Sequence, residues 1–314
     1  MQPTILAVFL EVPRTAFAMS MAGLALLVIG LLAAKSDIAQ ARGLDKAVAL
    51  TNVCCAVPLA VFGALHLFGA QFVMNIVPVY MPWRTFWVYF VGFALLAASL
   101  SMATKIGVRW SGLLFGIMMF LFVAMIHLPG ALRQPHDRII WTIVFRETSF
   151  GGAGWVLAGI AIGPSSAGQR KGLITVGRVV IALTAIFFGI QHFLHPLGLP
   201  GVPLKRQMPT WVPAPAIIDY LTGAFLMASG VCFLLARKVH MAATYLGAWI
   251  LLLVVVIYGP VLISGLADPG LGAKIEGINY FADTLLFAGV ILSLARANAA
   301  TPATSAESKR TSAG

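Results

Sequence analysis

The stretch HMAATYLGAWILLLVVVIYGPVLISG, residues 240–265, decides the fold class. It holds no Asp, Glu, Lys or Arg. An α-helix needs about 20 consecutive apolar residues to cross the hydrocarbon core of a bilayer, which is roughly 30 Å thick. This stretch is longer than that, so it is predicted to be a transmembrane helix.

Eight further apolar runs resemble it in length and composition. They cover residues 15–34, 48–69, 85–104, 108–130, 140–163, 173–195, 216–236 and 277–295. The run 140–163 is the most interrupted, because it contains Arg146 and Glu147. Together the runs predict an all-α, polytopic transmembrane bundle of about nine helices.

The composition excludes a soluble protein. The chain is 60% hydrophobic and 10% charged, with a mean hydropathy of +0.94, whereas soluble domains carry about 25% charged residues. The net charge of +11 does not indicate nucleic-acid binding, because the Lys and Arg residues fall in short loops between apolar runs and form no basic stripe. The expected partner is the lipid bilayer, and no nucleic acid is expected.

The basic residues instead predict the orientation. Loops on the side of the N-terminus hold 8 Lys and Arg, and loops on the other side hold 13 together with the C-terminal tail. Cytoplasmic loops carry the excess of positive charge. We therefore expect the N-terminus outside and the C-terminus in the cytoplasm.

The two ends of the chain differ from its centre. Residues 1–47 are predicted to form an N-terminal transmembrane helix and a loop. Ala39-Gln40-Ala41 resembles a signal-peptide cleavage site, but the apolar stretch is too long for a signal peptide and little positive charge precedes it. We expect this helix to be retained. The Ala/Thr/Ser-rich residues 297–314 are predicted to be a disordered tail.

The region between the ends contains a tandem repeat. Residues 48–165 (repeat A) and 173–296 (repeat B) each hold four runs and share short motifs in the same order. An even number of helices gives both copies one orientation, so the repeats are predicted to be parallel and related by an axis along the membrane normal. The matched motifs are Gly63-Ala64-Leu65-His66 with Gly189-Ile190-Gln191-His192, Met81-Pro82-Trp83 with Met208-Pro209-Thr210-Trp211, 91–96 with 221–226, His127-Leu128-Pro129 with Tyr258-Gly259-Pro260, and 145–148 with 281–284.

The polar residues of these motifs predict a site at the extracytoplasmic end. Ionisable groups within a membrane are costly and usually functional. Five ionisable residues lie at the ends of predicted helices on the same side of the membrane, and therefore at one depth. They are expected to meet or to form two related clusters. The candidate catalytic residues are His66, His127, Glu147, His192 and Asp283. The candidate cofactor-binding residues are Trp83, Arg146, Trp211 and Tyr258.

Each candidate also has a structural interpretation. The histidines could cap helix ends, and Glu147 and Asp283 could pair with helix N-termini or with Arg146. Alternatively, the carboxylates could relay protons beside a quinone headgroup. Metal ligation by His192 and His195, which lie three residues apart, and haem ligation are less favoured than a quinone, and no metal site is predicted. The three cysteines form no C-x-x-C motif and suit helix packing.

The combination of a Gly-x-x-His helix end, a Pro/Trp loop and the sequence Arg-Glu-Thr-Ser-Phe-Gly-Gly at residues 146–152 resembles the DoxX/DoxD-like family of bacterial membrane proteins. The resemblance covers residues 50–165 and, more weakly, 173–295. It implies a four-helix unit in tandem copies and a place in the bacterial inner membrane. Some members of this family are linked to thiosulfate:quinone oxidoreduction or to membrane redox complexes that protect against oxidative stress.

Two classes of function remain open at this point. One is a quinone-linked oxidoreductase, or a subunit of one, that works with other membrane or periplasmic redox proteins. Because no side chain here can carry the redox chemistry, the quinone would supply it. The other class is a non-enzymatic membrane scaffold, sorting partner or small-solute carrier.

Overall fold

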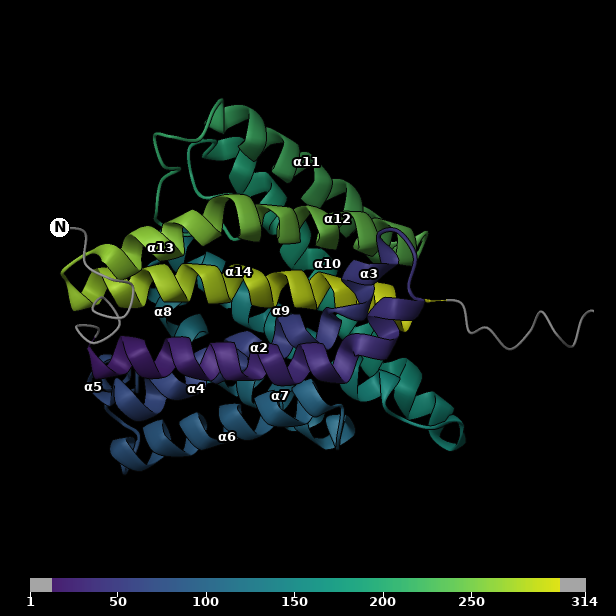
Figure 1. The fold of residues 1–314 in the computed structure, drawn as a ribbon, viewed down its shortest axis with the longest axis horizontal. Helices are drawn as coiled ribbons and strands as arrows, with labels where there is room; N and C mark the ends of the chain where they lie inside the picture. Colours follow the sequence, from purple (N-terminus) through teal and green to yellow (C-terminus); the bar gives the residue numbers. More distant parts are fainter. Residues whose placement is uncertain (1–12, 300–314) are drawn as a thin grey trace, which may run out of the picture.

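The computed structural model describes residues 13–299, and within this range the chain is helical with no β-strand. The prediction of an all-α polytopic bundle is confirmed. The predicted disordered tail falls almost entirely on residues 300–314, which lie outside the described range. The helices lie roughly side by side along one axis (Figure 1).

Repeat A begins after a long N-terminal helix, α2 (Arg14–Gln40), and a short one, α3 (Asp45–Ala49). A short helix, α5 (Ala70–Met74), interrupts the first connection of the repeat. The long helices of repeat A are α4 (Thr51–Phe68), α6 (Arg84–Thr104), α7 (Val108–Phe122), which continues through the π-helical segment Val123–His127 into α8 (Leu128–Arg133), and α9 (Arg138–Ile160).

Repeat B follows the same order after a short 3₁₀ turn, Pro164–Ser166. Its first connection, residues 195–214, contains no helix and makes one β-bridge between Gly198 and Gln207. The helices of repeat B are α10 (Ala167–Leu194), α11 (Pro215–Leu234), α12 (Val239–Leu253), which continues through the π-helical segment Val254–Tyr258 into α13 (Gly259–Ala267), and α14 (Leu271–Ala297).

Eight of the spans in residues 13–299 are long and apolar enough to cross a membrane. They match eight of the nine runs seen in the sequence. The remaining run corresponds to α9, a continuous helix of 23 residues. Arg146, Glu147 and several glycines make α9 less apolar than the others. The chain is therefore a multi-pass membrane protein.

The repeats share features that the sequence did not predict. The third helix of each repeat contains a π-helical segment. This segment ends at His127 in repeat A and at Tyr258 in repeat B. A left-handed residue precedes the second helix of each copy, Trp83 in one and Ala214 in the other. The sequence alignment had matched Trp83 with Trp211, so the structure shifts this correspondence. The reason is that the first connection is longer in repeat B.

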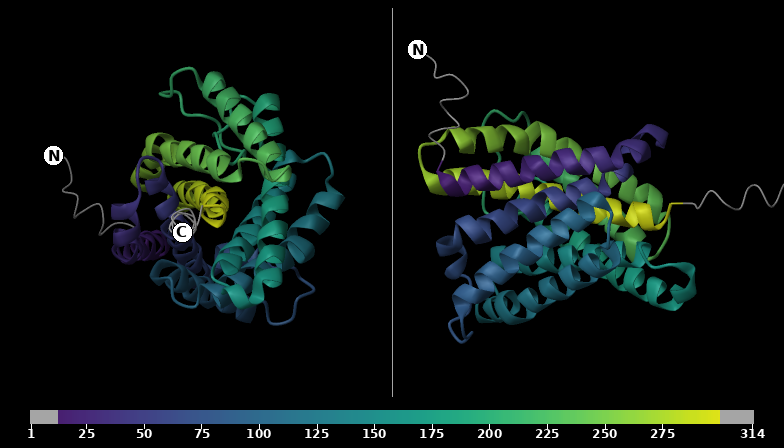
Figure 2. Two further views of the ribbon diagram at one scale, coloured as in Figure 1. Left: turned by 90° about the vertical axis from the view of Figure 1, so that its right-hand side faces the viewer. Right: turned by 60° about the horizontal axis from the view of Figure 1, so that its bottom comes forward.

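The first helix of each repeat packs against the last helix of the other repeat. α10, the first helix of repeat B, packs against α9, and α4, the first helix of repeat A, packs against α14. Glycines permit both close approaches: a Cβ on Gly177 would lie 2.4 Å from the Gly152 carbonyl, and one on Gly289 would lie 2.7 Å from the Cys55 sulfur. Viewed along the bundle, α14 lies inside the ring of other helices (Figure 2, left).

Candidate functional site

One end of the bundle carries the predicted site residues, and we call it the histidine end. It holds the C-termini of α4 and α10, the connections 69–83 and 195–214, and the start of α9. The start of α2 lies there as well, because the Thr15 hydroxyl donates to the Phe68 carbonyl at 2.8 Å. In Figure 1 this end, with α5, α8 and α13, is on the left.

His66 and His192 have the same local setting in the two repeats. Nδ1 of each ring lies 2.7 Å from the carbonyl oxygen four residues earlier, that of Phe62 or of Phe188. Each histidine also packs on a glycine of the next helix, because a Cβ on Gly92 or Gly223 would lie 3.0 Å from the histidine Cβ. The carbonyl holds the proton on Nδ1, so Nε2 of the neutral ring is a hydrogen-bond acceptor.

In repeat B the chain itself satisfies this acceptor. The Gly201 N–H donates to Nε2 of His192 at 2.9 Å, and the Tyr258 hydroxyl donates to the Pro200 carbonyl at 2.8 Å. The Pro200 carbonyl and the Gly201 N–H belong to one peptide group, so a single amide lies between the two side chains. His192 is 1% exposed and Tyr258 is fully buried. We call His192, Tyr258 and this peptide group cluster B.

Asp219 lies beside cluster B and was missed by the sequence analysis. It is 1% exposed, and its Oδ1 lies 3.7 Å from His192 Nε2. In the described part of the chain the Gly198 N–H approaches the carboxylate, but neither carboxylate oxygen makes a hydrogen bond of normal geometry. The signal that could have found it is an acidic residue inside the apolar run 216–236, since such residues are rare in membrane spans. Its counterpart in repeat A is the buried Val88, offset by the same 131 residues as Tyr258 from His127.

In repeat A the equivalent groups are not satisfied in this way. Within residues 13–299, Nε2 of His66 makes no hydrogen bond, and the same is true of both ring nitrogens of His127. Both side chains are half-buried. The Glu147 carboxylate lies within electrostatic range of both imidazoles. We call His66, His127 and Glu147 cluster A.

Arg146 joins cluster A to repeat B. Its guanidinium makes two ion pairs of 2.7 Å, from Nη2 to Glu147 and from Nη1 to Asp283. The three side chains are between 10% and 15% exposed. Asp283 therefore interacts with the charges of cluster A and not with cluster B, and the Arg146–Asp283 ion pair links α9 with α14.

Arg146 also lines a cavity of about 370 Å³. Its walls come from both repeats and include Arg146, Asp283 and Asn279, and the side-chain oxygen of Asn279 is buried without a partner in the described range. The apolar part of its wall includes Phe72, Ile139, Ile143, Leu204 and Ile275. The cavity can hold a small molecule with one polar and one apolar face.

The remaining candidates lie apart from the clusters. Trp83 is 79% exposed and Trp211 is 53% exposed, both in connections at the histidine end. His195 is exposed while His192 is buried, so this pair does not face one common ligand. Partial burial lowers the pKa of His195, and the nearby Arg138 lowers it further. Across residues 13–299, no three His, Cys, Asp or Glu side chains are placed to hold a metal ion.

Comparisons with family models, curated proteins and solved structures found no match to this chain.

Proposed function

We propose that cluster A binds the headgroup of a membrane quinol or quinone, and that the chain is a quinone-linked redox protein or a subunit of one. One observation carries the proposal. The acceptor nitrogen that repeat B saturates with its own Gly201 N–H is left without a protein donor at His66 in the described chain. A bound hydroxyl group can take that place.

The residues of cluster A suit such a headgroup. Nε2 of the neutral His66 accepts a hydrogen bond from a ligand hydroxyl and can receive its proton. Glu147 stabilises the imidazolium that forms, because opposite charges attract strongly at a partly buried site. Arg146 and Asp283 hold Glu147 in place on its other side. The quinone would supply the two-electron chemistry, and a redox partner protein would take or deliver the electrons.

The setting of the site is consistent with this proposal. A quinone dissolves in the bilayer and reaches a site near the membrane surface from the side, and the histidine end lies at such a surface. The similarity of residues 146–152 to DoxX/DoxD-like proteins points in the same direction. We propose the bacterial inner membrane as the location, with the histidine end on the extracytoplasmic side.

Binding of short-tailed quinols to the purified full chain in lipid nanodiscs tests the proposal. We expect His66→Ala, His127→Ala and Glu147→Gln each to weaken binding about tenfold, since each removes a polar contact worth about 1–2 kcal/mol. The reduced form should bind a few-fold more tightly than the quinone, because only the quinol offers a hydroxyl donor to His66 Nε2.

The control variants are Tyr258→Phe and His136→Ala. Tyr258 is the counterpart of His127 in repeat B. Both should bind quinol like the wild type. Folded cluster A variants that bind quinol normally, or an equal loss in Tyr258→Phe, would refute the assignment.

A small-solute carrier is the second candidate, and the cavity between α9 and α14 favours it. Its walls come from both repeats, as do the binding sites of many transporters with repeated halves. Asn279→Leu would replace the unpaired amide on the cavity wall with an apolar side chain of similar size, and it keeps the residues of cluster A. Loss of solute uptake into proteoliposomes in this variant, with normal quinol binding, would support the carrier and not the redox protein.

Reporter fusions test the proposed orientation. A cytoplasmic reporter fused after Ala299 should be active, and a periplasmic reporter inserted at the exposed Lys205, in the connection 195–214, should also be active. The reverse pattern would place cluster A on the cytoplasmic side.

A further inference from the structure

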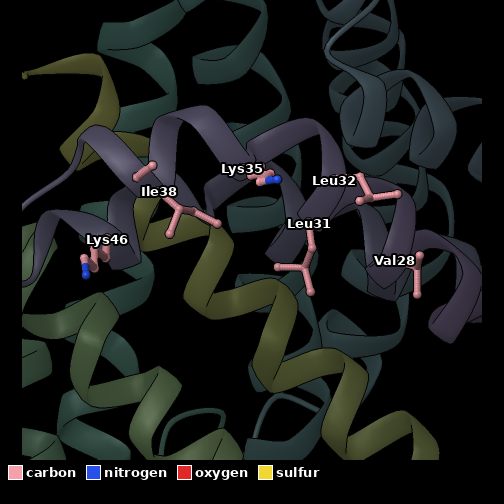
Figure 3. Close-up of a pocket in the computed structure, with 7 residues that line it drawn as sticks. Val28, Leu31, Leu32, Lys35, Ile38 and Lys46 are labelled. Carbon is pink, nitrogen blue, oxygen red and sulfur yellow. The ribbon is translucent and has the colours of Figure 1, made fainter.

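The end of the bundle opposite the histidines has a groove that no part of the proposed function uses. It has a volume of about 440 Å³ and runs along α2 to the start of α3. The wall is apolar, with Val28, Leu31, Leu32 and Ile38. Two lysines border it: Lys35 lies between Leu32 and Ile38 along α2, and Lys46 lies beyond Ile38, on α3 (Figure 3).

The lysines lie where a membrane surface is expected. α2 has 27 residues and is about 40 Å long, which exceeds the roughly 30 Å of a hydrocarbon core. Lys35 precedes the end of α2 by five residues, and Lys46 lies in the next helix. Val28 lies about 10 Å deeper than Lys35 along the helix. The groove thus leads from the headgroup level into the acyl-chain region.

The charges of the two lysines are not compensated locally. The nearby acids have other partners: Asp37 pairs with Lys105 at 2.8 Å, and Asp45 Oδ1 lies 3.5 Å from His240 Nε2. In the part of the chain described, neither Lys35 nor Lys46 makes an ion pair or a hydrogen bond, and both are exposed. Two ammonium groups without partners in this range therefore border the apolar groove, on its side nearer the membrane surface.

We propose that this groove is a binding site for an anionic phospholipid, independent of the histidine end. The phosphate binds at the end of the groove that Lys35 and Lys46 border, and one acyl chain lies along Leu32, Leu31 and Val28, toward the middle of the membrane. Basic pockets at helix surfaces near the headgroups are the usual binding sites of anionic lipids, and each lysine near the surface contributes about 1 kcal/mol. The apolar wall adds contact with the chain that a free phosphate could not make.

Native mass spectrometry of the full chain, titrated with phosphatidylglycerol or phosphatidylcholine, tests the site. The wild type should retain phosphatidylglycerol in preference to phosphatidylcholine. Lys35→Gln and Lys46→Gln should each weaken phosphatidylglycerol binding about fivefold and leave phosphatidylcholine binding unchanged. The matched control is Arg170→Gln with Lys171→Gln, which removes two exposed charges from the same end but outside the groove. This control should bind like the wild type.

Leu31→Trp distinguishes lipid binding in the groove from attraction by the lysine charges alone. It fills the groove and keeps both lysines, so phosphatidylglycerol binding should weaken although the net charge is unchanged. Equal losses in the Arg170/Lys171 control, or full binding in both lysine variants, would overturn the proposal and leave only non-specific annular lipid. Full binding in Leu31→Trp would also overturn it, because the headgroup charge alone would then explain the binding. All variants lie on exposed surface, and unchanged elution and melting temperature would show that each is folded.

Discussion

Repeats A and B place a histidine of the same tautomer at the same helix end, yet only one of them is saturated by the chain. In repeat B the Pro200–Gly201 peptide group fills the space between His192 and Tyr258. In repeat A the corresponding His66 and His127 make no such bond among the described residues. The longer connection of repeat B explains the difference, because it can fold back over the site.

The comparison teaches that a difference in loop length can leave one of two similar helix-end sites open while the chain closes the other. Cluster B anchors a loop, as a core contact does. Cluster A keeps the same acceptor geometry beside Glu147 and two further charges. If this distinction is correct, substitutions in cluster B should change mainly stability, and substitutions in cluster A should change mainly ligand binding.

Arg146→Met should have the largest effect on stability. It leaves Glu147 and Asp283 buried without their common partner, and breaking a buried ion pair in this way costs about 3–5 kcal/mol. The measurement is thermal or denaturant unfolding in detergent. Adding Glu147→Gln and Asp283→Asn to the same chain should recover most of the loss. Failure to recover would show that Arg146 acts through contacts other than these two.

His192→Ala should destabilise the protein by about 1–3 kcal/mol, because the Gly201 N–H is left buried without an acceptor. The connection 195–214 should also become more sensitive to protease. His66→Ala is the matched variant, and it should cost clearly less because its Nε2 bonds to no described group. Equal losses in the two variants would remove the distinction between the clusters.

Asp219→Val should stabilise the protein by about 1–2 kcal/mol. It removes a buried carboxyl group that makes no hydrogen bond of normal geometry in the described chain and has only the Gly198 N–H nearby, and such groups are unfavourable. Valine is also the residue at the equivalent position in repeat A, Val88. The same unfolding experiment measures this change in the free energy of unfolding. A loss of stability instead would mean that Asp219 has a partner, such as a bound ion or water.

Tyr258→Phe should have the smallest effect of the four, about 1 kcal/mol, from the loss of one buried hydrogen bond to Pro200. His127→Phe, at the equivalent position of repeat A, should leave stability unchanged but weaken quinol binding about tenfold, as His127→Ala does. If both variants are equally destabilised, His127 also holds its own loop in place.

The local sequence was sufficient to predict the membrane-spanning helices. Eight predicted spans and α9 agree with the observed helices to within a few residues at most ends, because length and apolar composition alone decide whether a segment can cross a bilayer. The order of motifs also brought His66, His127, Glu147 and Arg146 to one end, since helix ends alternate between the two membrane surfaces. Those motifs were misaligned only where the connections differ in length, as at Trp211.

The pairing of side chains depended on the tertiary structure. Arg146 and Asp283 are 137 residues apart and meet because α9 and α14 pack together at the centre of the bundle. The peptide group that fills cluster B lies in an irregular connection without periodicity, so no pattern could place it against His192. Sequence determined the spans, since burial of apolar residues in lipid is a local property. Tertiary structure decided which histidine is left open, since that depends on how helices and loops distant in sequence pack together.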